Sequence, residues 1–552
     1  MKSTKGLIGK LLTLAIALVM TLAFTAVPAK ADNVDVSGHT FKAYKIFKAD
    51  FVTTETNGTT ELTGLAWGEG VAAEAQTALL TAGGNATDVD ALAKYLTSAN
   101  DEQVKAFSDA VIAQKAKLGT PTTVTSGTTK LPLGYYLITD ESDATTITAV
   151  NKALLYVSTD ADVAVTVASK VEVPTSFKKV KDINDSEGTT MSGWQDTADW
   201  DIGDDVPFQL TATLPGNYSD YKDYHFTFHD KECAGLGAPE NVVVKMGDTV
   251  LTANTNYTFV APTTDNDSFD ITFSAVQLAR AKATNGATIT VEYTAKLNGS
   301  AKIGQEGNPN TSWITFNNDV NSEGTGTDKP ENGKTPHDTA IVFTYKAVFN
   351  KVDENNKPLS GASFTLLKKV TEGYTGAGKK TGAVVKSELT TANSKVDVSG
   401  IDDHGYYVVL STQETTPDTT FTFNGIDDGT YVLVETNTPD GYNPIKNQSF
   451  NVTATHADGE EVDFGQGADK EGTSGKNGNG DYVLTELNGT KVNGTITLDG
   501  TAATGVVHSD IQNKSGSTLP TTGGMGTTIF YVVGTVLVLG AGAVLISRKR
   551  SA

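Results

Sequence analysis

The chain has 552 residues, with 65 acidic and 43 basic side chains and a formal net charge of −22. It has no basic block beyond its two ends, which argues against nucleic acid as a partner. Its single cysteine, Cys233, excludes an intramolecular disulfide.

The chain begins with a segment typical of an export signal. Lysines precede an apolar run at 11–24, and Ala-Lys-Ala at 29–31 forms a small-x-small cleavage site. This pattern predicts that residues 1–31 are a secretory signal peptide and that the mature chain begins at Asp32. Exported domains are often stabilised by disulfides, so a chain without any is expected to have another stabilising feature.

The mature chain is too long for a single hydrophobic core and suggests roughly three domains. Changes in composition place these domains at 32–172, 173–325 and 340–514, with a polar linker at 326–339. Within 340–514, residues 451–505 exceed what a minimal domain needs and are expected to form a polar insertion.

Most of the mature chain alternates between apolar and polar residues, as half-buried antiparallel strands do, for example over 289–297. Between Val89 and Val111 the apolar residues instead recur at helical spacing. The expected fold class is mainly β, with tandem β-sandwich domains that are immunoglobulin-like in the general sense and helices added to the N-terminal domain.

The C-terminus carries a short motif, an apolar span and a basic tail. The motif is Leu519-Pro520-Thr521-Thr522-Gly523, the span covers 527–547, and the tail is 548–552. The span is long enough to cross a bilayer as a helix, and the basic tail is expected to stay in the cytoplasm. This arrangement resembles the cell-wall sorting signal of Gram-positive surface proteins. The resemblance implies that a sortase cleaves between Thr522 and Gly523 and transfers the threonine carbonyl to an amine.

The identity of that amine separates two functions. An amine of peptidoglycan would give a monomeric wall-anchored adhesin, and an amine of another copy of the chain would give a polymer. Residues 164–180 resemble the pilin-motif segment of the major subunits of sortase-assembled pili, and Lys170 matches the linking lysine. The family's Tyr-Pro before this lysine is Ala-Ser at 168–169. Strand alternation turns Lys170 outward, while Lys178 and Lys179 remain alternatives.

A frame of aromatic, any residue, lysine and valine recurs at 177–180 and 349–352. It resembles the first strand of the isopeptide-forming domains of Gram-positive pilins and adhesins, of the CnaA and CnaB types. In those domains a buried lysine joins an asparagine side chain while an Asp or Glu moves the proton. In the third, prealbumin-like domain the resemblance nominates Lys351, Asn513 and Glu435.

In the second domain the same resemblance nominates Lys179, Asn318 and Asp230. The preceding Phe177 sets the orientation of Lys179, because both lie at the same parity in the strand. Lys178 remains an alternative to the lysine, and Asn310 and Asn317 remain alternatives to the asparagine. The first domain offers no equally clear set.

The resemblance to major pilins of the SpaA and FimA type covers nearly the whole chain. It implies the structural backbone subunit of a covalent pilus, joined between Thr522 and Lys170 of neighbouring copies and held at the cell wall. The implied partners are pilus-class and housekeeping sortases, other copies of the chain, minor pilins, peptidoglycan and host surface ligands. The seven histidines show no metal-ligand spacing and no catalytic motif is present, so we expect no metal, no cofactor and no enzyme activity beyond autocatalytic bond formation.

Overall fold

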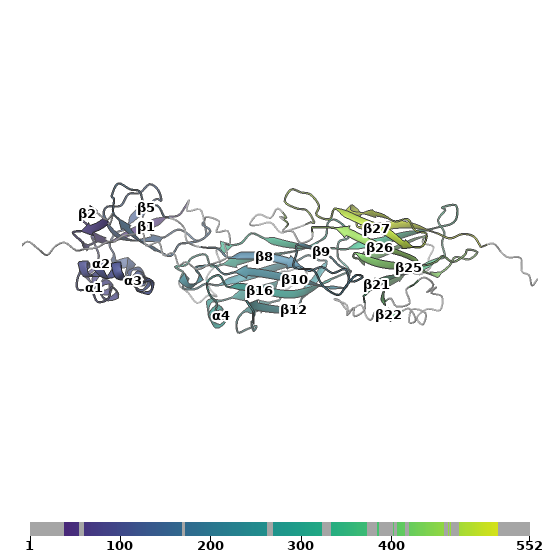
Figure 1. Cartoon of the computed structure of the whole chain (residues 1–552), viewed down its shortest axis with the longest axis horizontal. Helices are drawn as coiled ribbons and strands as arrows, with labels where there is room; N and C mark the ends of the chain where they lie inside the picture. Colours follow the sequence, from purple (N-terminus) through teal and green to yellow (C-terminus); the bar gives the residue numbers. More distant parts are fainter. Residues whose placement is uncertain are drawn as a thin grey trace, which may run out of the picture.

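The computed structural model is elongated, with three bodies that follow one another in chain order along its length (Figure 1). The structure describes residues 38–54, 60–167, 172–261, 269–322, 333–371, 384–385, 401, 406–413, 419–457, 462, 464 and 474–516. Lys170, the signal peptide, the sorting signal and the expected membrane span lie outside the described residues. Among the helices in those ranges, none has the length and apolar character needed to cross a bilayer.

The first body combines a sheet with three helices, which lie together on one side of the body (Figure 1). The sheet has the order β4-β1-β6-β7, and β5 also pairs with β1. The helix α3 begins at a capping box formed by Asn100 and Gln103, and it buries Val104, Phe107 and Val111 at helical spacing. The elements are β1 (Phe41–Lys48), β2 (Phe51–Thr54), β3 (Thr60–Thr63), β4 (Ala66–Trp67), α1 (Ala73–Ala82), α2 (Val89–Ser98), α3 (Asp101–Ala113), η1 (Lys115–Lys117), β5 (Thr122–Val124), β6 (Gly134–Asp140) and β7 (Leu154–Ser158).

The second body is a sandwich of two sheets. One sheet has the order β13-β12-β16-β10-β8, and the other has the order β14-β15-β11-β17-β19-β9 with β18 paired to β17. The elements are β8 (Thr175–Val180), β9 (Thr197–Asp199), β10 (Asp205–Thr213), η2 (Tyr218–Asp220), β11 (Phe226–Glu232), β12 (Leu236–Met246), β13 (Thr249–Val250), β14 (Thr258–Val260), β15 (Phe269–Phe273), α4 (Ala275–Arg280), β16 (Thr288–Leu297), β17 (Asn308–Phe316), β18 (Gly333–Lys334) and β19 (Asp338–Phe343).

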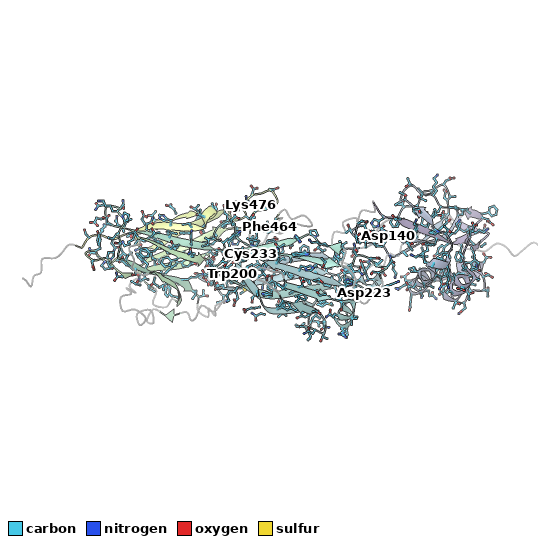
Figure 2. All side chains as sticks on the ribbon, turned by 180° about the vertical axis from the view of Figure 1, so that it is seen from behind. Asp140, Trp200, Asp223, Cys233, Phe464 and Lys476 are labelled. Atoms are coloured by element: carbon cyan, nitrogen blue, oxygen red, sulfur yellow. The ribbon has the colours of Figure 1, made fainter. Side chains whose placement is uncertain are left out.

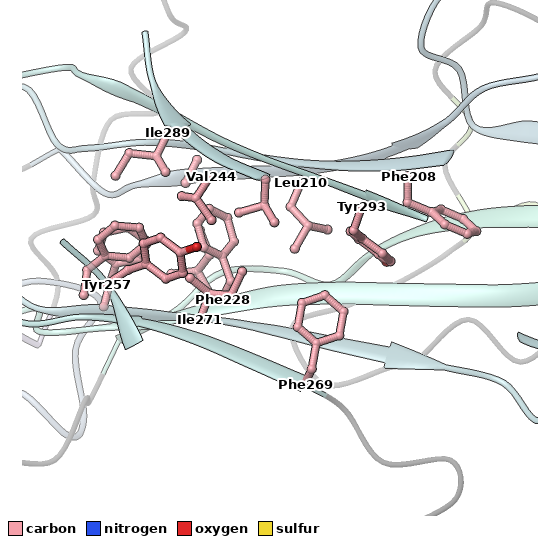
Figure 3. Close-up of a cluster of buried hydrophobic side chains, with 14 of the residues drawn as sticks. Phe208, Leu210, Phe228, Val244, Tyr257, Phe269, Ile271, Ile289 and Tyr293 are labelled. Carbon is pink, nitrogen blue, oxygen red and sulfur yellow. The ribbon is translucent and has the colours of Figure 1, made fainter. Parts of the chain in front are cut away.

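The core of the second body lies between these two sheets. Strict alternation along β10 and β16 buries every second residue, so Phe208, Leu210 and Tyr293 face the opposite sheet. Figure 3 shows these side chains meeting Phe228 and Phe269 from the other sheet. The aromatic rings of Phe269 and Tyr293 meet edge to face, with centroids 5.0 Å apart.

The third body is also a two-sheet sandwich, and its first and last strands are neighbours. The sheets have the orders β24-β20-β29-β28 and β22-β23-β21-β25-β26-β27. The elements are β20 (Tyr345–Val352), β21 (Ser363–Val370), β22 (Val384–Val385), β23 (Tyr406–Gln413), β24 (Thr420–Ile426), β25 (Gly429–Asn437), β26 (Gln448–Thr455), β27 (Glu486–Asn493), β28 (Asp499–Thr501), η3 (Ala502–Thr504) and β29 (Val506–Gln512). The strands β20 and β29 run parallel, with Lys351 opposite Ile511.

These sheets confirm the predicted fold class of tandem β-sandwiches with helices in the N-terminal domain. The predicted boundary between 339 and 340 is wrong, however, because it falls within β19. That strand pairs with β17 and β9 and therefore belongs to the second body. The polar composition of 326–339 suggested a linker, but Thr339 to Phe343 are buried in the sandwich.

Candidate cross-linking sites

The third body brings Lys351, Glu435 and Asn513 together, as expected from the sequence. Lys351 and Asn513 are fully buried, and Glu435 is nearly so. The amide nitrogen Nδ2 of Asn513 donates to Oε1 of Glu435 at 3.0 Å. The ammonium of Lys351 donates to the carbonyls of Val352 and Ile511 at 3.2 and 3.0 Å, between the ends of β20 and β29.

The surroundings of this site favour its uncharged forms. Burial lowers the pKa of Lys351 to about 8 although Glu435 opposes the shift. About a tenth of such amines are therefore neutral at pH 7. Burial also raises the pKa of Glu435, even though the backbone N–H of Ile445 and the hydroxyl of Thr438 donate to its Oε2. A neutral amine is a nucleophile, and a protonated carboxyl can donate its proton.

A second set lies in the core of the second body and contains Lys178. Its ammonium contacts Oδ2 of Asp230 at 2.5 Å and the hydroxyl of Tyr293 at 2.8 Å. The Tyr293 hydroxyl donates to the same carboxylate oxygen at 3.0 Å and accepts from Nδ2 of Asn310 at 2.8 Å. Lys178 lies on β8 of one sheet, whereas Asp230 and Asn310 lie on β11 and β17 of the other. This set therefore joins the two sheets across the core.

The protonation of Lys178 and Asp230 follows from their burial. Both residues are completely buried. Burial lowers the pKa of Lys178 although Asp230 opposes it, and burial raises the pKa of Asp230 although Lys178 opposes it. The two shifts agree, because both favour transfer of the proton from the lysine to the aspartate. The rings of Phe208 and Tyr293 lie 5.1 and 5.3 Å from the ammonium and keep water away.

The structure contradicts the predicted inward orientation of Lys179 in the second body. Phe177 is 41% exposed, whereas Lys178 and Val180 are fully buried, so the inward parity of β8 is that of Val180. The side chain of Lys179 points to the other side and pairs with Asp196 at 2.6 Å. The prediction used the aromatic residue to set the inward direction, but Phe177 lies on the outer face of an edge strand.

The structure gives the predicted asparagine, Asn318, partners outside the second body. Asn310, Ile314, Phe316 and Asn318 share the inward parity, so alternation alone does not separate the two asparagines. Asn318 follows the end of β17 and donates to the carbonyls of three residues in the first body. These are Ala144, Ile147 and Thr148, at 2.9 to 3.0 Å.

Asn318 therefore connects the first and second bodies rather than two strands of one sandwich. Its own carbonyl accepts from the backbone N–H of Val150 at 2.8 Å, which extends the connection into the backbone. Figure 2 places Asp140 and Asp223, which lie near this junction, at the narrow region between the two bodies. Asn317, the remaining alternative, donates to the Asp223 carbonyl instead.

We expect Asn318→Ala to loosen the junction of the first and second bodies. The variant loses three hydrogen bonds that the fully buried Asn318 side chain donates to partly buried carbonyls, at a cost of about 1–3 kcal/mol. Limited proteolysis should then cleave near the junction faster than in the wild type. The mass of the second body should stay unchanged, and a mass increase of one ammonia would show that Asn318 is a bonding residue after all.

A third buried lysine, Lys368, was not predicted from the sequence. It lies on β21 in the third body and contacts Asp427, Asp185 at 2.6 Å and Asp201 at 3.2 Å. Burial alone would lower the pKa of Lys368, but Asp201 and Asp427 outweigh it and hold the pKa well above its usual value. Lys368 is therefore a charged structural residue at the junction of the second and third bodies, and it differs in this from Lys178 and Lys351.

Residues 511–552 match the LPXTG cell wall anchor motif of Gram-positive bacteria. The C-terminus of the chain therefore carries a cell wall anchor motif of the LPXTG type. Residues 346–468 match the SpaA family, described as a prealbumin-like fold domain. The anchor match confirms the predicted location at the cell wall, and the SpaA match agrees with the resemblance of the third domain to a prealbumin-like domain.

A curated relative of this chain is the trypsin-resistant surface T6 protein of Streptococcus pyogenes serotype M6. It is 25% identical over 297 residues, and the match spans about half of each protein, 48% of either chain. Among solved structures, the T6 backbone pilin of S. pyogenes is 17% identical, with 88% of this chain and 98% of that chain covered and a TM-score of 0.46. The major pilin SpaD of Corynebacterium diphtheriae is 18% identical, with 87% and 93% covered and a TM-score of 0.40.

Proposed function

We propose that the protein is the backbone subunit of a covalently polymerised surface pilus. The observation that carries this proposal is the combination of a SpaA-type match at 346–468 with an LPXTG cell wall anchor at 511–552. A pilus-class sortase joins the Thr522 carbonyl of one copy to Lys170 of the next, and a housekeeping sortase transfers the finished polymer to peptidoglycan. Minor pilins and host surface ligands are the remaining partners of this proposal.

The elongated shape supports a role as a structural unit of a filament (Figure 1). Hydrogen bonds connect each body to the next, through Asn318 at the first junction and through Ser186 at the second. The hydroxyl of Ser186 donates to the Lys369 carbonyl and accepts from the backbone N–H of Thr430. We place three domains at these bodies, with the second ending after β19 rather than at 325.

The same proposal includes two internal isopeptide bonds. In the second domain the neutral amine of Lys178 attacks Cγ of Asn310, and in the third the amine of Lys351 attacks Cγ of Asn513. Each reaction forms one C–N bond, breaks the bond from Cγ to Nδ2 and releases ammonia. Asp230 or Glu435 takes the proton from the amine and returns it to the leaving nitrogen, so the acid is regenerated.

The polymer is tested by the mass of the wall-anchored material. Wall extracts boiled in SDS should give a ladder of bands spaced by one mature subunit, because the linkage between copies is covalent. Lys170→Ala should remove the ladder while a single band remains at the surface. Lys130→Ala provides the matched control, because Lys130 is an exposed lysine of the first domain.

The outcomes separate the two functions. A ladder that persists in Lys170→Ala contradicts the assignment of Lys170, and a single band from the wild type contradicts the pilus. The single band would favour the monomeric wall-anchored adhesin, whose two stapled domains would form a stalk.

A further inference from the structure

Six aspartates gather where the second and third domains meet. Asp182, Asp185, Asp199 and Asp201 come from the second domain, and Asp427 and Asp428 come from the third. Figure 2 places the neighbouring Trp200 at this junction. Two groups of three residues there bring ligand atoms within 4.8 Å of one another: Asp185 with Asp201 and Asp427, and Asp182 with Asp199 and His456.

The two groups are neutralised differently. In the first group the ammonium of Lys368 contacts all three carboxylates, so a cation of the protein itself already lies between them. In the second group the imidazole of His456 joins the carboxylates, with its Nε2 at 3.6 Å from Oδ2 of Asp182. The second group thus contains an imidazole nitrogen, from His456, that can bind a metal ion, whereas the first group contains the ammonium of Lys368, which cannot.

The orientation of His456 is set by Thr197. The Thr197 hydroxyl donates its one proton to the Ala457 carbonyl at 3.0 Å. At 2.9 Å from Nδ1 of His456 it must therefore accept the proton of that nitrogen. A neutral His456 then carries its lone pair on Nε2 and directs it at the carboxylates. Histidines that bind metals are held in this way by a hydrogen bond from the other ring nitrogen.

Further buried polar side chains surround this second group. Among the described residues, Oδ1 of Asp428 makes no hydrogen bond, and the hydroxyl of Tyr345 lies within reach of the Asp199 carboxylate. Asp199 is 2% exposed and Tyr345 is completely buried. Burial and then the charge of Asp199 raise the pKa of Tyr345 well above its usual value, which places the hydroxyl beside this carboxylate. Burial and the charge of Asp182 raise the pKa of Asp199 to about 7.

We propose that His456, Asp182 and Asp199 bind one divalent transition-metal ion of the Zn²⁺ class. One imidazole nitrogen and two carboxylates are a ligand set that zinc accepts, whereas calcium takes six to eight oxygen ligands. Because Asp182 and Asp199 belong to the second domain and His456 to the third, the ion joins the two domains.

The test measures metal binding by the full chain, purified in detergent and stripped with EDTA. We expect one equivalent of Zn²⁺ per chain by elemental analysis, a higher melting temperature with Zn²⁺ than without, and visible absorption from Co²⁺ in the same site. Asp199→Asn keeps the shape of the side chain and should weaken Zn²⁺ binding at least 100-fold. Its melting temperature without metal should not fall, because the substitution removes one of several crowded negative charges.

Two further variants separate a ligand from a merely structural residue. Thr197→Val should weaken binding about 10- to 100-fold, because it removes the group that fixes the orientation of His456. His508→Ala is the matched control, since this exposed histidine also faces a carboxylate, Asp510, at 3.7 Å, and its binding should equal that of the wild type. Absence of Zn²⁺ binding, unchanged affinity in Asp199→Asn, or equal stabilisation by Ca²⁺ would each overturn the proposal.

Discussion

Glu435→Ala is expected to leave the third domain uncondensed, one ammonia heavier than a condensed chain of the same sequence. Without the carboxyl group, nothing moves the proton from the Lys351 amine to the leaving nitrogen of Asn513. On the loop-entropy model, loss of a cross-link that closes most of the domain costs about 5 kcal/mol. The melting temperature of the third domain should fall by about 10–20 °C.

Intact mass spectrometry of the full chain checks this result, because each bond removes one ammonia from the mass expected from the sequence. Glu354→Ala is the control, since Glu354 is an exposed glutamate of the same domain that hydrogen-bonds Ser515 near the end of β29. The control should retain both bonds. A fully matured Glu435→Ala chain that still lacks two ammonias would show that Glu435 is not needed for condensation.

Lys178→Ala and Lys179→Ala should behave in opposite ways. Lys178→Ala cannot form the bond to Asn310, so the chain should retain one ammonia and lose the corresponding stabilisation of about 5 kcal/mol. Lys179→Ala removes the ion pair with the buried carboxylate of Asp196 and is expected to be destabilising for that reason alone. It should nevertheless keep both bonds, so its mass should equal that of the wild type apart from the substitution.

Peptide mapping provides the second measurement. A tryptic digest of the wild type should contain a cross-linked peptide that joins the segments around Lys178 and Asn310, and the digest of Lys179→Ala should contain the equivalent cross-link. If the cross-link is absent from Lys179→Ala and present in Lys178→Ala, the assignment in the second domain is reversed.

The sequence predicted the third-domain set because its strand has a regular environment. In β20, Tyr345, Ala347, Phe349 and Lys351 all face the core, so the parity of Phe349 correctly oriented the lysine. The same argument was wrong in β8, which pairs with β10 alone in its sheet and exposes Phe177. An aromatic residue therefore indicates the inward face of a central strand such as β20, but not of an edge strand such as β8, where an aromatic side chain can also lie on the outer face.

The sequence also did not reveal which position along a strand lies next to the reactive lysine. Asn310 and Asn318 share parity, but only the register of β17 against β11 places Asn310 opposite Glu232 and close to Asp230. The junction cluster was missed for a related reason. His456 lies far from Asp182 and Asp199 in the sequence, so no motif with metal-ligand spacing contains all three residues. They come together only because β9 and the end of β26 meet at the junction.

The parallel pairing of β20 and β29 has a consequence for tension along the filament. Load that enters the third domain at Tyr345 travels along β20 to Lys351, crosses the proposed bond to Asn513 and leaves toward the C-terminus. Every residue between Lys351 and Asn513 is then bypassed. Under tension the domain can extend by no more than the length of one strand. Substitutions in the loops between Lys351 and Asn513 should therefore leave its resistance to force unchanged.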